Sequence, residues 1–258
     1  MSLHADSGVL VTGGGTGIGR AASLIFAREG ARVAVCDRNA ETAGETVAQI
    51  EKAGGQALFI EVDVADPDSV RRMVETAAKE FGRLDAAFNN AGINHPNAAF
   101  HETKAELWQS MLDVNLSGVF WCMQQEIRQM LDQDPREGCR GAIVNTSSGA
   151  AIVPAPGAPH YTAAKHGVVG ITKVAAQEYS DRGIRCNSVL PGVIDTPMSQ
   201  AALAGGTPEY RKALESTLPE GRMGRPEEVG ELAVWLASSR ASWINGESVQ
   251  VNGGGVIR

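Results

Sequence analysis

The sequence predicts an α/β fold in which a doubly wound parallel sheet is covered by helices on both faces, giving three layers. Short apolar, β-branched runs alternate with helical patterns along the chain, as is typical of parallel strands joined by helical crossovers. A glycine-rich turn, residues 13–19, separates the first such run from the first helical pattern. No linker, repeat or low-complexity tract interrupts the 258 residues, so we expect a single domain over residues 1–258.

Composition excludes several classes of protein. The apolar fraction of 43% and charged fraction of 21% are ordinary for a globular chain. A net charge of −7 without any basic run argues against nucleic-acid binding. No apolar run is long enough to span a bilayer, and the first residues lack a signal-peptide pattern, so no membrane association is expected.

The cysteines indicate a reducing compartment. Four of them are widely spaced and form no C-x-x-C pair: Cys36, Cys122, Cys139 and Cys186. Buried free thiols in a cytoplasmic protein are therefore expected, rather than disulfides. Because no cluster of Cys and His ligands occurs, we predict no metal site and exclude a zinc alcohol dehydrogenase.

The first strand, helix and second strand form a Rossmann-like βαβ unit. Residues 8–12 end at the glycine turn, a helix begins at Ile18 and ends at Gly30, and residues 32–36 form the next strand. Residues without a Cβ allow a tight turn and close approach of phosphates, and the start of the helix supplies free N–H groups. The unit therefore predicts a dinucleotide site.

Asp37, after the second strand, indicates which dinucleotide is preferred. A carboxylate there can accept hydrogen bonds from the adenosine ribose hydroxyls and would repel a 2′-phosphate. Arg38 could tolerate a phosphate, although we favour a solvated side chain at a strand end. We therefore predict NAD as the cofactor, with NADP as the alternative.

The later elements repeat the alternation. Asn39 and Asp66 have the positions of helix N-caps, and Thr103 with Glu106 has the spacing of a capping box. The predicted helices cover residues 18–29, 40–53, 67–81, 111–131, 160–178 and 226–238. The predicted strands cover residues 8–12, 32–36, 57–62, 84–88, 142–145, 184–190 and 248–251. Polar side chains gather where ligands bind such sheets, at the carboxyl ends of strands: Thr12, Asp37, Asp63 and Asn89.

Residues 198–223 differ from the rest of the chain. Gly205-Gly206 and several prolines predict one or two short helices in a mobile excursion, the composition of a lid over a substrate. Its larger apolar members suggest a partly apolar ligand: Met198, Leu203, Tyr210, Leu214 and Leu218.

Tyr161 and Lys165 carry the strongest chemical signal. They are four residues apart in a predicted helix and so share one face. A free phenol titrates near ~10, and an ammonium held beside the phenolate lowers that pKa. The tyrosine could then act as a general acid or base near neutral pH. The same pair also occurs on ordinary exposed helices, so the interpretation depends on the rest of the site.

Three motifs together resemble the short-chain dehydrogenase/reductase family. They are Thr12-Gly13-x-x-x-Gly17-Ile18-Gly19, Asn89-Asn90-Ala91-Gly92, and Tyr161-x-x-x-Lys165 with Ser148 thirteen residues earlier. The Pro191-Gly192 element and the Gly253-Gly254 end agree, so the resemblance covers essentially the whole chain. Two departures are Asn252 in place of the usual aspartate and the long polar loop 132–140.

The resemblance implies a role for each site residue. Ser148 would hydrogen-bond the substrate oxygen, Tyr161 would transfer the proton, Lys165 would lower the tyrosine pKa and bind the nicotinamide ribose, and Asn115 would hold a water in the proton path. The implied cofactor contacts are Gly13, Thr16, Gly17, Ile18 and Gly19 at the pyrophosphate, Asp37 and Arg38 at the ribose, Asp63 and Val64 at the adenine, Asn89, Ala91, Gly92, Pro191 and Gly192 along the cofactor, and Ile194 and Thr196 at the carboxamide. Thr16 stands where NADP-preferring relatives often carry a basic residue, which agrees with the prediction from Asp37.

The expected activity is NAD-linked interconversion of a secondary alcohol and a ketone, with Tyr161 as acid and base. Alternatives are an NADPH enzyme similar to 3-oxoacyl-thioester reductases, and a catalytically silent nucleotide-binding relative. The resemblance also implies a homotetramer. His160 could tune the tyrosine, and His95 with Asn94 could line the substrate pocket or lie in a solvated loop. Which small-molecule alcohol or ketone is the substrate is not readable from the sequence.

Overall fold

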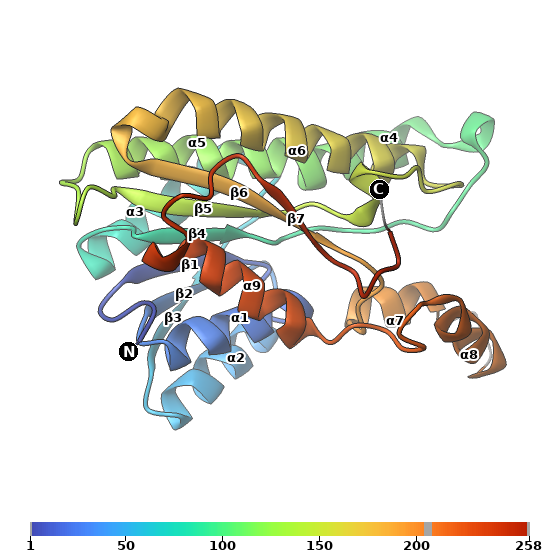
Figure 1. The fold of residues 1–258 in the computed structure, drawn as a ribbon, viewed down its shortest axis with the longest axis horizontal. Coiled ribbons are helices and arrows are strands. Elements are labelled where there is room, and N and C mark those ends of the chain that lie inside the picture. The colour runs from blue at the N-terminus through green and yellow to red at the C-terminus, as the bar shows by residue number, and fades with distance from the viewer. Residues whose placement is uncertain (1, 204–207, 257–258) are drawn as a thin grey trace.

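A seven-stranded parallel sheet forms the centre of the molecule (Figure 1). The computed structural model describes residues 2–203 and 208–256, without the side chains of residues 202–210 and 213. The strands are β1 Gly8–Thr12, β2 Arg32–Asp37, β3 Gln56–Glu61, β4 Ala86–Asn89, β5 Gly141–Thr146, β6 Ile184–Pro191 and β7 Ser248–Val251. Their order is β3-β2-β1-β4-β5-β6-β7. The order reverses between β1 and β4, so the crevice for a ligand lies at the carboxyl ends of these two strands.

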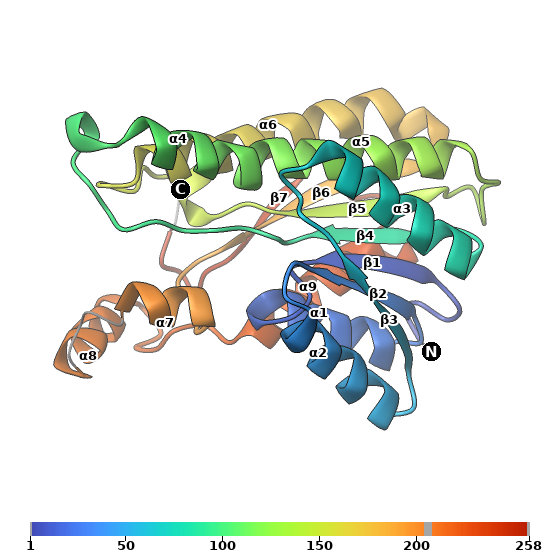
Figure 2. The same cartoon turned by 180° about the vertical axis from the view of Figure 1, so that it is seen from behind.

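Helices cover both faces of the sheet, which confirms the predicted three layers (Figures 1 and 2). One core lies between the sheet and α1 Gly17–Arg28, α2 Ala40–Lys52 and α9 Pro226–Ala237. The other lies between the sheet and α3 Pro67–Phe81, α5 Gly118–Leu131 and α6 Pro159–Tyr179. Because both faces are buried, the central strands are apolar throughout rather than alternating.

Two of the three predicted helix starts are confirmed. The Asn39 side chain accepts hydrogen bonds from the N–H groups of residues 41 and 42, and Asp66 accepts one from residue 68. The Thr103 capping box is wrong. α4 Ala105–Leu112 begins after Lys104, which makes no side-chain cap, and the Thr103 hydroxyl instead donates to the Ala99 carbonyl at 3.3 Å. Thr103 instead ends a 3₁₀ turn, Phe100–Glu102.

The helix predicted over residues 111–131 is interrupted. A π-helical segment, Asp113–Ser117, joins α4 to α5. Asn115 lies inside it, fully buried, and its side chain pairs with the backbone of Ile93 in both directions, at 2.8 Å each. π-helical segments are rare and often occur at functional sites. The break therefore indicates that the position of Asn115 against the loop after β4 serves a functional site rather than the stability of the helix.

The glycine turn is held by close backbone contacts. Gly13 has φ +64°, and a Cβ there would lie 3.0 Å from the Cα of Ala91. A Cβ on Gly19 would lie 2.0 Å from the Gly13 carbonyl oxygen, which no relaxation could accommodate. These two glycines therefore allow the turn to pass between β1 and α1 while the start of α1 faces the crevice.

Residues 198–223 form two short helices, α7 Pro197–Leu203 and α8 Pro208–Thr217, which stand away from the main body (Figures 1 and 2). Arg211 of α8 forms an ion pair with Asp195 at 2.8 Å, and Gln200 of α7 donates to the same carboxylate at 3.0 Å. Gly205-Gly206, on which the prediction of a mobile excursion partly rests, and the Leu203 and Tyr210 side chains lie outside the described residues. Within the described chain, no helix has the length and apolarity needed to cross a membrane.

Candidate active site

A cavity of about 420 Å³ lies at the carboxyl ends of the strands, beside the point where the sheet order reverses. It extends from the glycine turn and Asp37 to Tyr161 and the start of α7. All but two of the residues predicted for the site line it: Gly13, Thr16, Gly17, Ile18, Asp37, Arg38, Asp63, Val64, Ala91, Gly92, Asn115, Ser148, Tyr161, Lys165, Pro191, Gly192, Ile194 and Thr196.

The glycine turn fits a dinucleotide. Gly17, the first residue of α1, has φ +51°, and a Cβ there would approach the Thr196 side chain to 3.2 Å. The turn therefore presents bare backbone to the cavity, beside the unpaired N–H groups at the start of a twelve-residue helix. This arrangement suits a pyrophosphate, because the N–H groups and the positive end of the helix dipole both favour anions.

Asp37 defines the other end of the cofactor cleft. One of its carboxylate oxygens accepts a hydrogen bond from Gly15 N at 2.9 Å, and the other accepts one from Asn39 N at 3.0 Å. These two bonds fix the carboxylate at the cavity wall. Arg38 is largely exposed and lies 4.0 Å from the Asp63 carboxylate, so its charge is directed toward a neighbouring acid.

Ser148, Tyr161 and Lys165 meet at the far end of the cavity. The Ser148 side chain acts on the Tyr161 phenol, whose pKa it lowers. The Lys165 ammonium lies 5.6 Å from the centre of the tyrosine ring and donates to the Thr146 carbonyl at 2.9 Å. Ser147, the neighbouring candidate, donates its hydroxyl to the Lys165 carbonyl at 2.8 Å. Ser147 therefore braces α6, and Ser148 is the serine that faces the phenol.

Burial dominates the pKa values of this pair. It raises the pKa of Tyr161 above its ordinary value, and the hydrogen bond from Ser148 lowers it by a smaller amount. Burial also lowers the pKa of Lys165 to about 8. The predicted lowering of the tyrosine pKa by Lys165 is not seen here, because the ammonium is directed at the Thr146 carbonyl rather than at the phenol oxygen.

Asn115 uses its whole amide to hold the loop after β4. The carboxamide oxygen accepts from Ile93 N, and the NH₂ group donates to Ile93 O and to the Met111 sulfur. The side chain is thus fully used in holding this loop, and the role of Asn115 in holding a water stays a prediction.

The structure places two predicted cofactor contacts elsewhere. Asn89 is buried in the core, where its NH₂ group donates to Glu126 and Asn145, and Gly19 packs beneath the turn. Asn90 lines the cavity instead of Asn89. Side chains alternate along a strand, so consecutive residues face opposite sides of the sheet. The sequence motif alone does not show which of the two asparagines faces the cavity.

Met198, expected from the lid, lines the cavity, and several other lining residues were missed by sequence reasoning: Val62, Ile93, Val114, Thr146, Val193, Pro197 and Ser199. Most are apolar and carry no chemical signature. Asn94 also lines the cavity, as one of the two alternatives expected, whereas His95 is hydrogen-bonded to Ser110 at 2.9 Å. The ring of His160 accepts from the Tyr161 backbone N–H at 2.8 Å, so it contacts the start of the helix rather than the phenol.

Comparison with known proteins agrees with this geometry. A family model described as Enoyl-(Acyl carrier protein) reductase matches residues 13–255. A solved short-chain type dehydrogenase/reductase from Mycobacterium marinum is 36% identical, covers 100% of this chain and 99% of its own, and superposes with a TM-score of 0.90. This chain belongs to the short-chain dehydrogenase/reductase family. Members of this family are oxidoreductases that use nicotinamide cofactors.

Curated relatives from the short-chain dehydrogenase/reductase family are similar over their full lengths. A 2,5-dichloro-2,5-cyclohexadiene-1,4-diol dehydrogenase of Sphingobium indicum is 41% identical, over 98% of both chains. A cyclohexanol dehydrogenase of an Acinetobacter species is 41% identical, over 95% of this chain and 92% of its own. A 3-oxoacyl-(acyl-carrier-protein) reductase of Thermotoga maritima is 39% identical, over 96% and 97%. Levodione reductase, a solved structure, is 35% identical over 97% and 98% of the chains, with a TM-score of 0.91.

Proposed function

We propose that this protein is an NAD-dependent dehydrogenase that interconverts a secondary alcohol and a ketone, with Tyr161 as the general acid and base. The observation that carries the proposal is one cavity with a carboxylate suited to a ribose, Asp37, at one end and the Ser148–Tyr161–Lys165 group at the other. A nicotinamide bound between them would accept or return the hydride.

The chain's own residues handle the substrate oxygen and its proton. The Ser148 hydroxyl can donate a hydrogen bond to that oxygen while Tyr161 takes or returns the hydroxyl proton. A phenolate formed inside the protein needs a nearby positive charge, since burial disfavours it. Lys165 is the cation available, buried beside the tyrosine ring. Asn115 would support a proton path behind Lys165 through its backbone carbonyl.

We infer that the substrate is a cyclic secondary alcohol or ketone with an apolar ring. Several of the side chains that line the cavity are apolar, among them Ile93, Val114, Val193 and Met198. Two curated relatives and one structural neighbour carry names of cyclic substrates, a cyclohexadienediol, cyclohexanol and levodione. We further propose that α7 and α8 act as the lid over this pocket.

A panel of alcohols tests the proposal. Cyclohexanol, cyclohexane diols and linear secondary alcohols of matched carbon number would be compared with NAD, by following NADH absorbance. We expect kcat/KM for the cyclic alcohols to exceed that for the linear ones by roughly tenfold, because a preformed ring loses less conformational freedom on binding. Higher kcat/KM for 3-oxoacyl thioesters with NADPH would instead favour the second candidate, to which the name of the Thermotoga relative points.

Asp37 should determine cofactor choice. Asp37→Asn removes the charge and keeps one acceptor oxygen, so that only one of the two bonds from Gly15 N and Asn39 N can remain. A hydrogen bond to a charged group is worth roughly 1.5–3 kcal/mol, so kcat/KM with NAD should fall ~10–100-fold. NADP use should rise, because the repulsion of a 2′-phosphate is lost. Steady-state kinetics with both cofactors measure the change.

Glu41→Gln is the matched control for Asp37. It removes one charge from the exposed first turn of α2 without touching the cavity, so the ratio of NAD to NADP activity should not change. A wild-type enzyme that already prefers NADPH would contradict the cofactor assignment, whatever Asp37→Asn does.

We also propose a homotetramer in the cytoplasm. Large apolar side chains remain exposed on α4, α5 and α6 and could lie in a subunit contact: Trp108, Phe120 and Val174. All four cysteines are free, and three of them are buried, which suits a reducing compartment. Cys139 is only half-buried and departs from the prediction of buried thiols.

A further inference from the structure

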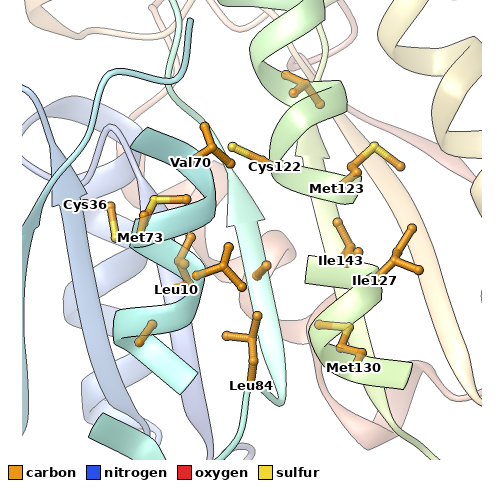
Figure 3. Close-up of a cluster of buried hydrophobic side chains, with 14 of the residues drawn as sticks. Leu10, Cys36, Val70, Met73, Leu84, Cys122, Met123, Ile127, Met130 and Ile143 are labelled. Atoms are coloured by element: carbon orange, nitrogen blue, oxygen red, sulfur yellow. The ribbon is translucent and has the colours of Figure 1, made fainter. Parts of the chain in front are cut away.

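A carboxyl group lies fully inside the protein, away from the cavity. Glu126 is in the middle of α5 with none of its surface exposed. Its helix neighbours Cys122, Met123 and Ile127 pack into the apolar core between α3, α5 and the sheet, together with Cys36 from β2 (Figure 3). Charged side chains are almost never fully buried without a partner, so this position needs an explanation.

Glu126 begins a chain of buried hydrogen bonds across the sheet. One of its oxygens, Oε2, accepts from Asn89 Nδ2 at 2.9 Å. The same Nδ2 donates to Asn145 Oδ1 at 3.0 Å, and Asn145 Nδ2 donates to the Thr172 hydroxyl at 2.9 Å. The chain therefore links α5, β4, β5 and α6 beneath the active site.

Two oxygens in this series of hydrogen bonds have no hydrogen-bond partner themselves: Glu126 Oε1 and Asn89 Oδ1, both buried. If Glu126 is a carboxylate, both atoms are acceptors and neither can satisfy the other. A carboxylic acid, in contrast, presents an O–H donor on Oε1. A single proton on Glu126 Oε1 can thus be donated to Asn89 Oδ1, which gives both unpartnered oxygens a hydrogen bond. The same two residues are already joined through Glu126 Oε2 and Asn89 Nδ2.

The surroundings of Glu126 also favour the neutral acid. The other titratable groups that act on or near it are thiols, Cys36 of β2, Cys122 of α5 and Cys186 of β6. Burial raises the pKa of the Glu126 carboxyl to about 8, and the hydrogen bond from Asn89 opposes this only in part. No cation acts on this carboxyl among the described residues that influence its pKa.

We propose that Glu126 is a protonated positioning residue, whose acid–amide pairing with Asn89 fixes the ends of β4 and β5 on either side of the active-site cavity. Asn89 is followed by Asn90, which lines the cavity and whose N–H donates to the Thr12 hydroxyl. Asn145 is followed by Thr146, whose carbonyl accepts from the Lys165 ammonium. A displacement of the two asparagines therefore moves both the cofactor wall and the partner of Lys165. The protonation state is independent of the proposed function, and only the catalytic consequence rests on it.

Infrared spectroscopy and unfolding test the protonation state without any assay of activity. In wild type near pH 7 we expect the carbonyl-stretch band of a buried carboxylic acid, which is absent in Glu126→Gln. Folding favours the protonated form, because the folded pKa of about 8 is above the ordinary value of 4.5. The unfolding midpoint of wild type should therefore fall relative to Glu126→Gln as the pH rises from about 4.5 to about 8, and the difference should stay constant above that.

Glu75→Gln is the matched control, since Glu75 is an exposed carboxylate on α3 paired with Arg71. It should leave the band and the pH dependence unchanged. A wild-type spectrum without the band, or a difference between wild type and Glu126→Gln that does not change with pH, would overturn the assignment of a neutral acid.

Kinetics test the positioning role. Glu126→Gln keeps both a donor and an acceptor toward Asn89, so kcat should stay within about twofold of wild type. Glu126→Leu keeps the volume but not the pairing. A misplacement of about 1 Å at the active site can cost ~100-fold, so we expect kcat to fall by at least tenfold, with a smaller change in KM for the alcohol. Equal kcat in a folded Glu126→Leu and in Glu126→Gln would overturn the positioning role, while the infrared result would stand.

Discussion

Replacing Tyr161 with phenylalanine is expected to lower turnover by ~10²–10⁴-fold, the range that a positioned general acid or base contributes. Phenylalanine keeps the ring that lies beside the Lys165 ammonium and removes only the hydroxyl that Ser148 contacts. Binding of NADH should therefore change little. Stopped assays of alcohol oxidation give kcat, and NADH fluorescence titration gives the dissociation constant.

Tyr179→Phe is the matched control for this experiment. Tyr179 is at the other end of the same helix, where its ring lies 5.8 Å from the Arg182 guanidinium and far from the cavity. Its variant should keep full activity. Wild-type turnover in Tyr161→Phe would refute the proposed mechanism, and loss of NADH binding would mean that the tyrosine supports the site structurally.

Replacing Lys165 with methionine should abolish turnover and weaken NAD binding without destabilising the fold. Folding disfavours the ammonium, because burial lowers its pKa from 10.5 to about 8. The resulting loss in the free energy of unfolding is fully present below about pH 8 and disappears as the pH rises from about 8 to about 10.5. The shift corresponds to roughly 3 kcal/mol at 1.36 kcal/mol per unit. Leaving the Thr146 carbonyl unpaired costs ~1–3 kcal/mol, so the two effects nearly cancel.

The expected pattern is therefore inactive protein with an unfolding midpoint near that of wild type, measured by calorimetry at pH 7. Lys173→Met, an exposed lysine on the same helix, is the control and should change neither activity nor NAD binding. An active Lys165→Met enzyme would remove the lysine from the mechanism. A strongly destabilised Lys165→Met protein would show that the ammonium stabilises the fold, and that the two free-energy effects do not cancel.

The sequence predicted the sheet and its helical layers because glycine turns, caps and apolar runs act locally. Asn39 and Asp66 cap their helices whatever surrounds them. Asn89 and Asn90 show where such reasoning stops. Asn89 is the last residue of β4 and Asn90 follows it, so one side chain lies in the core and the other lines the cavity, and this depends on where the strand ends.

Features that arise from distant contacts were not predictable. The π-helical segment at Asn115 exists because its side chain pairs with the backbone of Ile93, twenty-two residues earlier in the chain. Glu126 looked like any polar residue in an amphipathic helix, since a single sequence does not show that Asn89 reaches it from β4. In the same way, the ammonium of Lys165 could be placed near Tyr161, but its choice of the Thr146 carbonyl could not.

The ion pair between Arg211 and Asp195 has a consequence for the order of events during turnover. Asp195 lies between Ile194 and Thr196, two residues that line the cavity, and it holds α8 through that ion pair. If α8 acts as the proposed lid, its movement over an alcohol would pull on the same short turn that we expect a cofactor to touch. Coupling of this kind is reciprocal: if the bound cofactor changes the affinity for the alcohol by some factor, the bound alcohol changes the affinity for the cofactor by the same factor. Alcohol and dinucleotide should thus behave as mutual effectors, with one preferred order of addition.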